Sequence, residues 1–194
     1  MRRRLALTVL LAVAAGACTP RFNWREVRSA DGGYAVLFPG KPQIATRDVE
    51  FMGNKIAMTM TSTGTGPTMF AVGVVVLPDG ALRTPQRAQT LEWFADGLAR
   101  NLGAPRATVE PISTPARLAA AGTDTAAFDI ASRGKLRDRG VDRDGREARL
   151  AARFYVVDDR LFQLIAIGAE GEIPPQALET FFDSFRLLSQ KGAP

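Results

Sequence analysis

Short apolar runs separated by turn signals constrain the fold of this 194-residue chain more than any other feature of its sequence. Two of the runs, 69–77 and 161–167, are apolar at nearly every position, which is typical of strands buried on both faces. Gly, Pro, Asn or Asp residues stand between most of the runs, as expected for turns. The sequence therefore predicts strands at 24–29, 34–38, 43–51, 55–62, 69–77, 108–112, 123–132, 148–157 and 161–167.

Two amphipathic helices accompany these strands. The first is expected to begin with Thr84 as its N-cap and Pro85 at its first helical position, and to end at Gly103. The second is expected to begin near Pro174 and Pro175. Each carries an apolar stripe at helical spacing: Ala88, Leu91, Phe94, Ala95, Leu98 and Leu102 in the first, and Leu178, Phe181, Phe182 and Phe185 in the second.

The order of these elements predicts the fold class. Strands buried on both faces need cover on both sides of their sheet, and the two helices offer apolar stripes that can supply it. Turns at 52–54 and 158–160 are expected to join neighbouring strands as hairpins. We therefore predict an α+β fold in which a mainly antiparallel β-sheet is covered by helices on both faces, an α/β/α sandwich. Residues 24–190 show no internal repeat or boundary, so a single domain is expected.

The first eighteen residues have the pattern of a bacterial export signal. Arg2, Arg3 and Arg4 precede an uncharged run, and small residues at 15–17 lead to Cys18, the only cysteine of the chain. A basic start, an apolar core and small residues at the cleavage point define a secretory signal peptide. A membrane-spanning helix needs about 20 apolar residues, so this run is too short to be one.

The residues before Cys18 resemble the lipobox of bacterial lipoproteins, although Ala15 stands where that motif usually has Leu. The resemblance implies removal of 1–17, lipid on the sulfur and amino group of Cys18, and a short tether at 18–23. Thr19 instead of Asp after the cysteine is similar to lipoproteins sent to the outer membrane, facing the periplasm, rather than kept in the inner membrane. The alternative is a plain secretory signal with an incidental cysteine.

Composition narrows the function classes. Loss of the signal removes three arginines, which leaves 22 basic and 20 acidic residues and a net charge of +2 instead of +5. This balance gives no reason to expect nucleic acid binding. The chain has no histidine, which excludes a Ser-His-Asp triad, a Cys-His pair and an imidazole metal site. We expect a protein that is not an enzyme and that uses no cofactor and no metal.

Three stretches resemble the PsbP-like superfamily. Residues 33–42 (GYAVLFPGKP) are similar to its opening Y-x-V-x-F-P-G-x-P motif, and 153–164 are similar to its central hairpin. Residues 181–187 (FFDSFRL) resemble its closing F-x-x-S-F-R-L helix. These motifs are structural, so the resemblance implies the superfamily's α/β/α sandwich and a non-enzymatic binding or accessory role. No residue here matches a functional site of that family.

Candidate sites beyond Cys18 are weak. Asp142 and Asp144 precede Gly145 as in a calcium loop, but Gly140 and Ala151 occupy two of the ligand positions, which favours a polar turn. A basic arm at 133–153 is a possible contact with anionic headgroups, although nearby acidic residues favour a solvated hairpin with mixed ion pairs. Four aromatic residues are candidates for a sugar groove, but core positions are more usual for them: Trp24, Tyr34, Trp93 and Tyr155.

The sequence thus predicts a lipid-anchored cell-envelope protein that acts as a non-enzymatic accessory or scaffold domain. Its expected partners are the membrane, through lipid on Cys18, and another envelope protein. The alternative is a periplasmic lipoprotein that binds a small ligand or glycan. A preformed concave pocket would favour the alternative, whereas a flat exposed apolar patch would favour the scaffold.

Overall fold

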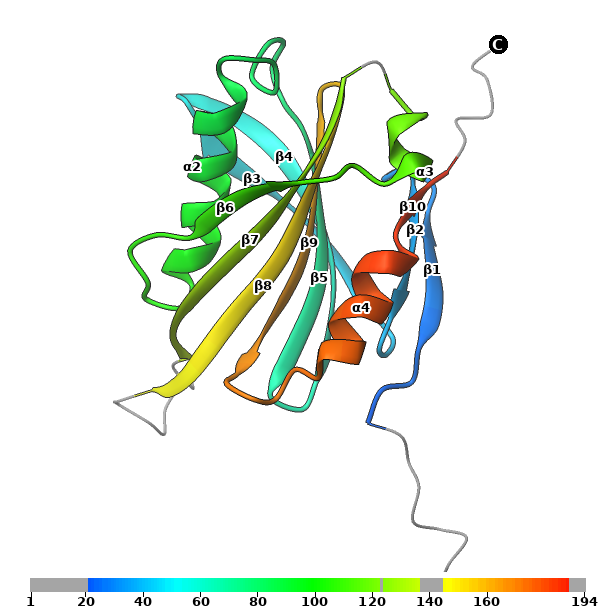
Figure 1. Ribbon diagram of the computed structural model, residues 1–194, viewed down its shortest axis with the longest axis vertical. Helices are drawn as coiled ribbons and strands as arrows, with labels where there is room; N and C mark the ends of the chain where they lie inside the picture. Colours follow the sequence, from blue (N-terminus) through cyan, green and yellow to red (C-terminus); the bar gives the residue numbers. More distant parts are fainter. Residues whose placement is uncertain (1–20, 123, 137–144, 189–194) are drawn as a thin grey trace, which may run out of the picture.

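The computed structural model describes residues 21–122, 124–136 and 145–188, and strands dominate this part of the chain (Figure 1). Seven of them form one antiparallel sheet in the order β3-β4-β5-β9-β8-β7-β6. In that spatial order, the bounds are β3 (Gln43–Phe51), β4 (Asn54–Thr65), β5 (Thr68–Val76), β9 (Arg160–Ala169), β8 (Arg146–Val157), β7 (Thr125–Leu136) and β6 (Thr108–Ile112).

The predicted hairpin at 52–54 is confirmed. β3 and β4 pair from Gln43 opposite Ser62 to Phe51 opposite Asn54, with Met52 and Gly53 between them. Both turn residues have positive φ, 48° and 79°, which is the backbone twist that a two-residue hairpin favours. The β8–β9 hairpin is likewise confirmed, with Val157 opposite Arg160.

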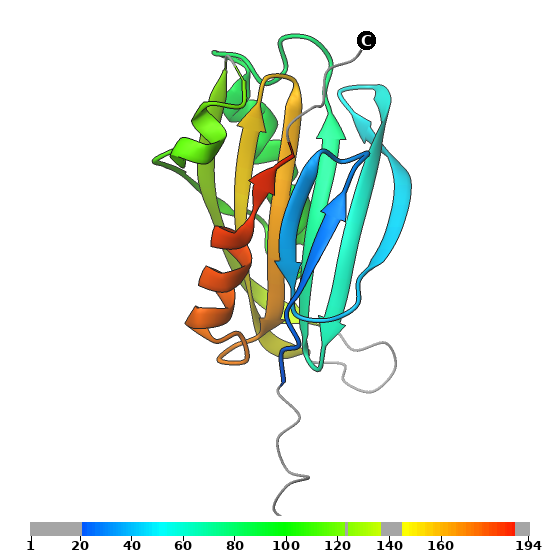
Figure 2. The ribbon, with the colours of Figure 1, turned by 90° about the vertical axis from the view of Figure 1, so that its right-hand side faces the viewer.

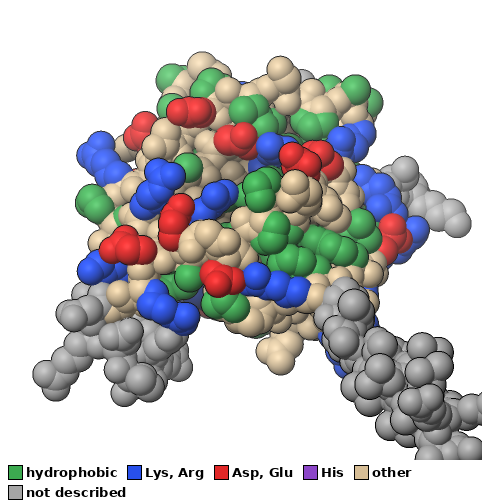
Figure 3. Space-filling view, turned by 60° about the horizontal axis from the view of Figure 1, so that its bottom comes forward, with side chains coloured by type: hydrophobic (Ala, Val, Ile, Leu, Met, Phe, Trp, Pro, Cys, Tyr) green, Lys and Arg blue, Asp and Glu red, His purple; other side chains and the backbone are tan. Residues whose placement is uncertain are grey.

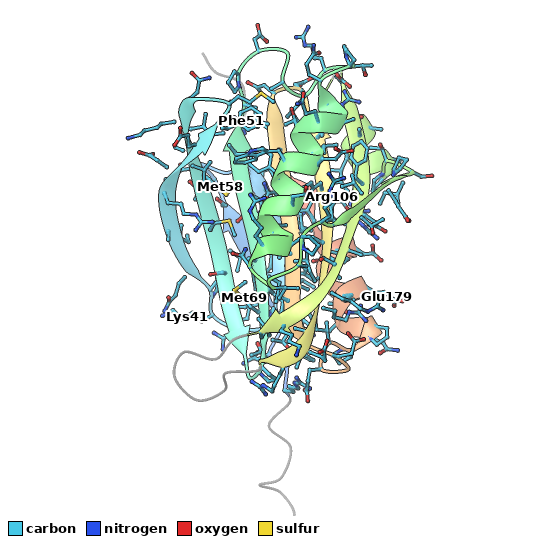
Figure 4. The ribbon with its side chains drawn as sticks, turned by 90° about the vertical axis from the view of Figure 1, so that its left-hand side faces the viewer. Lys41, Phe51, Met58, Met69, Arg106 and Glu179 are labelled. Carbon is cyan, nitrogen blue, oxygen red and sulfur yellow. The ribbon has the colours of Figure 1, made fainter. Side chains whose placement is uncertain are left out.

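One face of the seven-stranded sheet is covered by α2 (Arg87–Arg100), as Figure 4 shows. The helix and the residues after it bury Leu91, Phe94, Ala95 and Leu102 of the predicted stripe, whereas Ala88 is exposed and Leu98 is half-buried. It begins two residues later than expected. The N–H of Arg87 donates to the carbonyl of Arg83, and the hydroxyl of Thr90 donates to the carbonyl of Ala81. Thr84 and Pro85 therefore belong to a turn packed beside the helix start, and neither caps it.

The opposite face carries a second, smaller sheet and one helix (Figure 2). This sheet has the order β1-β2-β10. Its strands and the helices near it are β1 (Arg25–Ser29), β2 (Tyr34–Phe38), β10 (Arg186–Leu187), α4 (Pro175–Ser184) and α3 (Ala116–Ala119). The core between the layers contains Tyr34, Val36, Phe38, Phe70, Val72, Tyr155, Phe162, Leu164, Phe181 and Phe185.

This arrangement corrects the predicted fold class. The expectation that helices alone cover both faces of the sheet is wrong, because a second sheet covers one face together with α4. Strands make up 51% and helices only 18% of the structure. Tyr34, Val36 and Phe38 project from β2 into the second core, so a strand covers surface that was assigned to a helix. The predicted closing helix at 181–187 is also too long, because α4 ends at Ser184 and Arg186–Leu187 pairs with β2.

Phe185 joins the two layers of this second core. It follows α4 directly and is fully buried. Its ring stacks on Tyr34 and Tyr155, with centroid distances of 5.8 and 5.2 Å, and lies 5.4 Å from the ring of Phe162. One side chain thus contacts the small sheet and two strands of the large one, which fixes the distance between them.

Candidate functional site

A large concave feature lies at the end of the molecule where the described chain begins, which we call the tether end. It is a cavity of about 920 Å³ between the last turn of α2 and the sheet below it. Figure 4 shows Met69 on the sheet below the helix and Lys41 at the outer edge. Its volume falls in the range of about 300–1,000 Å³ that is usual for ligand pockets.

The floor and roof of this cavity are apolar. Met60, Met69 and Ile165 project from β4, β5 and β9, while Leu98 forms the roof from α2. Met69 is 40% exposed although it lies on a strand near the centre of the sheet, because α2 does not extend over it. Methionine side chains are flexible and polarizable, so these walls can adapt to an apolar ligand.

The roof is held in place by a close contact between α2 and β7. The chain leaves α2 through Leu102, whose carbonyl accepts a 2.8 Å hydrogen bond from the N–H of Lys135. Gly134 allows this approach, since a Cβ at that position would collide with the Leu102 carbonyl. The contact fixes the end of the helix above the sheet and leaves the space beyond it open.

The rim of the cavity is basic. Lys41, Arg47 and Arg146 line it, and no Asp or Glu is among its described lining residues. Gln43, Ala45 and Arg47 alternate along edge strand β3, so all three lie on the cavity face. The hydroxyl of Thr63 donates to the Lys41 carbonyl over 3.3 Å, which holds the chain before β3 against β4.

The start of the described chain lies at the same end of the large sheet as this cavity, but on the opposite face. Arg21 donates to the backbone carbonyl of Glu172 over 3.0 Å and to its carboxylate over 2.7 Å. Thr68, a lining residue of the cavity, donates its hydroxyl to the same carbonyl over 3.4 Å. Figure 3 shows this end of the molecule, where a group of adjacent hydrophobic side chains lies among basic and acidic ones.

Two smaller cavities lie at the opposite end, on either side of the β8–β9 turn. Asp158 and Asp159 line both of them. Asp158 has φ of 55° and accepts a 3.1 Å hydrogen bond from the N–H of Asp124, which identifies it as a turn residue. Among the described residues, no group of three or more acidic or cysteine side chains could hold a metal ion.

The four aromatic residues that the sequence offers for a sugar groove do not lie together on one surface. Tyr34 and Tyr155 are buried in the second core, where burial raises the pKa of both phenols. Trp24 packs near Phe70 in that core, whereas Trp93 packs on the other face of the sheet. These four aromatic residues therefore do not form a sugar groove.

The basic arm is partly described. Arg153 pairs with Asp129 over 2.7 Å and lies 5.0 Å from the ring of Phe182, while Lys135 lies 3.8 Å from Glu147. Cys18 and residues 137–144 of this arm, which include Asp142 and Asp144 of the calcium-like loop, lie outside the described residues. Within the described part, no helix is long and apolar enough to cross a membrane.

Comparison with known proteins adds no further assignment, since no family model and no curated protein matches this chain. The sequence reasoning missed Lys41 and Arg47, the two cations on the β3 side of the cavity. Lys41 enters the sequence analysis only as part of the motif at residues 33–42. Arg47 could have been found from the sequence, because Gln43, Ala45 and Arg47 follow one another at two-residue spacing. This spacing predicts that they share one face of a strand.

Proposed function

We propose that this protein is a lipid-anchored, non-enzymatic protein of the cell envelope that binds a small ligand with an apolar body in the tether-end cavity. The proposed anchor is lipid on Cys18, and the proposed location is the periplasmic side of the outer membrane. The cavity is the observation that carries the proposal. An apolar interior with a few polar groups at its rim is the usual form of a small-molecule site.

The sequence favours an accessory or scaffold role and gives ligand binding as the alternative. This proposal places ligand binding first. A scaffold that docks another protein through an apolar surface needs a contiguous patch. The large apolar side chains that are most exposed among the described residues are Ile44, Met52, Met69 and Val76. Ile44 lies on β3 and Met52 in the following turn, while Met69 and Val76 lie near opposite ends of β5. Their separation favours the ligand-binding function.

The test uses the full-length protein with its own signal and lipid, reconstituted in phosphatidylcholine nanodiscs. A hexadecyl alcohol that carries a diazirine in its chain is added and photolysed, and adducts are mapped by mass spectrometry of peptides. We expect adducts on peptides that contain Met60 and Met69. Ala45→Trp, which places a large side chain at the cavity mouth, should reduce them severalfold.

The matched control is Ile44→Trp. Ile44 is the neighbouring residue on the same strand, points away from the cavity and is 66% exposed, so this variant should be labelled like the wild type. Equal labelling of both variants, or no adducts at these peptides, would refute the binding site. The anchor is tested separately with a palmitate analogue, whose incorporation should disappear in Cys18→Ala.

A further inference from the structure

The charges around the tether-end cavity differ from those of the chain as a whole. The complete chain has 25 basic and 20 acidic residues, yet the cavity is lined by three cations and no described carboxylate. Neither Lys41 nor Arg47 forms an ion pair with another described residue. By contrast, aspartates line both cavities at the opposite end of the sheet. The rim is therefore complementary to an anion.

The cations and the apolar walls occupy different parts of the cavity. Lys41 and Arg47 lie at the β3 edge, which Figure 4 shows for Lys41 at the outer margin of the sheet. The apolar side chains extend inward from there across β4, β5 and β9: Met60, Met69, Ala71, Ile165 and Ile167. A molecule that follows this surface has its charge at one end and its apolar part along the sheet.

The position of the tether shows where such a molecule would come from. Arg21 and the lining residue Thr68 both donate to the carbonyl of Glu172, so the beginning of the described chain lies at the cavity end of the sheet, on its other face. Cys18 precedes Arg21 by three residues, which span at most about 11 Å. If Cys18 carries lipid, this end of the molecule lies close to a bilayer.

From these observations we infer that the cavity binds a single-chain anionic amphiphile, a long-chain fatty acid, taken up from the adjacent membrane. Its carboxylate pairs with a rim cation at the β3 edge, Lys41 or Arg47, and its chain lies on Met60 and Met69. This inference rests on the proposed function and specifies its ligand class. A carboxylate that accepts a hydrogen bond from either cation gains a charge-assisted bond that a neutral alcohol of the same length lacks.

The experiment compares a fatty acid with an alcohol. Full-length protein in phosphatidylcholine nanodiscs is photolabelled with diazirine-bearing hexadecanoic acid or hexadecanol at equal ratios to lipid. We expect the acid to label the Met60 and Met69 peptides about tenfold or more strongly than the alcohol, with the difference falling at high salt.

Charge reversal at the rim isolates the head-group contact. The double variant Lys41→Glu, Arg47→Glu should lose the preference for the acid and keep its labelling by the alcohol. The matched control is Arg25→Glu, Lys55→Glu, in which both residues are exposed and lie outside the cavity. This control should label as the wild type does with both probes.

Each outcome separates the inference from the proposed function. Equal labelling by acid and alcohol in the wild type overturns the inference but leaves a ligand site in the cavity. If the control variant loses the preference for the acid to the same extent as the rim variant, the preference comes from general surface charge. That result also overturns the inference. No labelling of these peptides by either probe overturns both proposals.

Discussion

Gly134 offers a direct test of how α2 is held above the sheet. This residue lies on β7 opposite Ala148, and its backbone runs against the turn that follows α2. A Cβ at this position would meet the Leu102 carbonyl and would lie 2.8 Å from the Cβ of Leu102. The substitution Gly134→Ala must therefore displace backbone, not only a flexible side chain.

The expected magnitude follows from three contributions. Overpacking of a tight contact costs about 1–3 kcal/mol. Weakening the hydrogen bond from Lys135 to Leu102, now 2.8 Å long, costs about 0.5–1.5 kcal/mol. The lower entropy of the unfolded chain offsets about 0.4–1 kcal/mol of this loss. We therefore expect Gly134→Ala to lower the free energy of unfolding by about 0.5–4 kcal/mol.

Urea denaturation followed by tryptophan fluorescence measures this change, with the slope of the transition checked for constancy between variants. The matched control is Gly64→Ala, also in a strand, where an added Cβ meets nothing within 4 Å. This control should be neutral or slightly stabilising. If Gly134→Ala is as stable as Gly64→Ala, the close contact between β7 and the end of α2 does not exist in solution.

Two further predictions concern the second core and its sheet. Phe185→Ala removes the ring that stacks on Tyr34 and Tyr155 and should lower the free energy of unfolding by about 3–5 kcal/mol in the same assay, and a loss below about 1 kcal/mol would contradict this packing. Hydrogen bonds from Arg28 and Arg186 lower the pKa of Glu26 below its ordinary value of 4.5. Ionised Glu26 therefore stabilises the fold above pH 4.5, and this contribution is lost as the pH falls through the lowered pKa. A carboxyl titration by NMR should give a midpoint below 4.5 that rises in Arg186→Ala, whereas a midpoint at or above 4.5 in the wild type would contradict the bonds.

Local signals were sufficient to locate most strands and both long helices. The turn Met52-Gly53-Asn54 predicted the first hairpin, because its Gly53 accepts the positive φ that a tight turn needs. β6, with bounds Thr108–Ile112, agrees with the predicted strand residue for residue. Edge position also explains why Pro111 is tolerated there, since a proline lacks the N–H that a central strand would need. In each case neighbouring residues decide the conformation.

The layer that covers the second face was not predictable in the same way. The nearly continuous apolar residues of β9 correctly indicated burial on both faces. They do not indicate which element provides the cover. That cover depends on β2, where Ala35 pairs with Arg186 about 150 residues later in the chain. A two-residue strand such as β10 has no periodicity of its own, so its residues were assigned to the preceding helix.

The sequence by itself determined the positions of the strands and turns, the burial of both faces of the central strands, and the expectation of an anchor at Cys18. Only the tertiary structure decided that a second sheet covers one face and that a basic-rimmed cavity remains open beside α2. The physical reason is the range of the interactions. Periodicity and turn preferences act between neighbouring residues, whereas Arg47, Leu98 and Ile165 meet at one cavity only because β3, α2 and β9 are packed together.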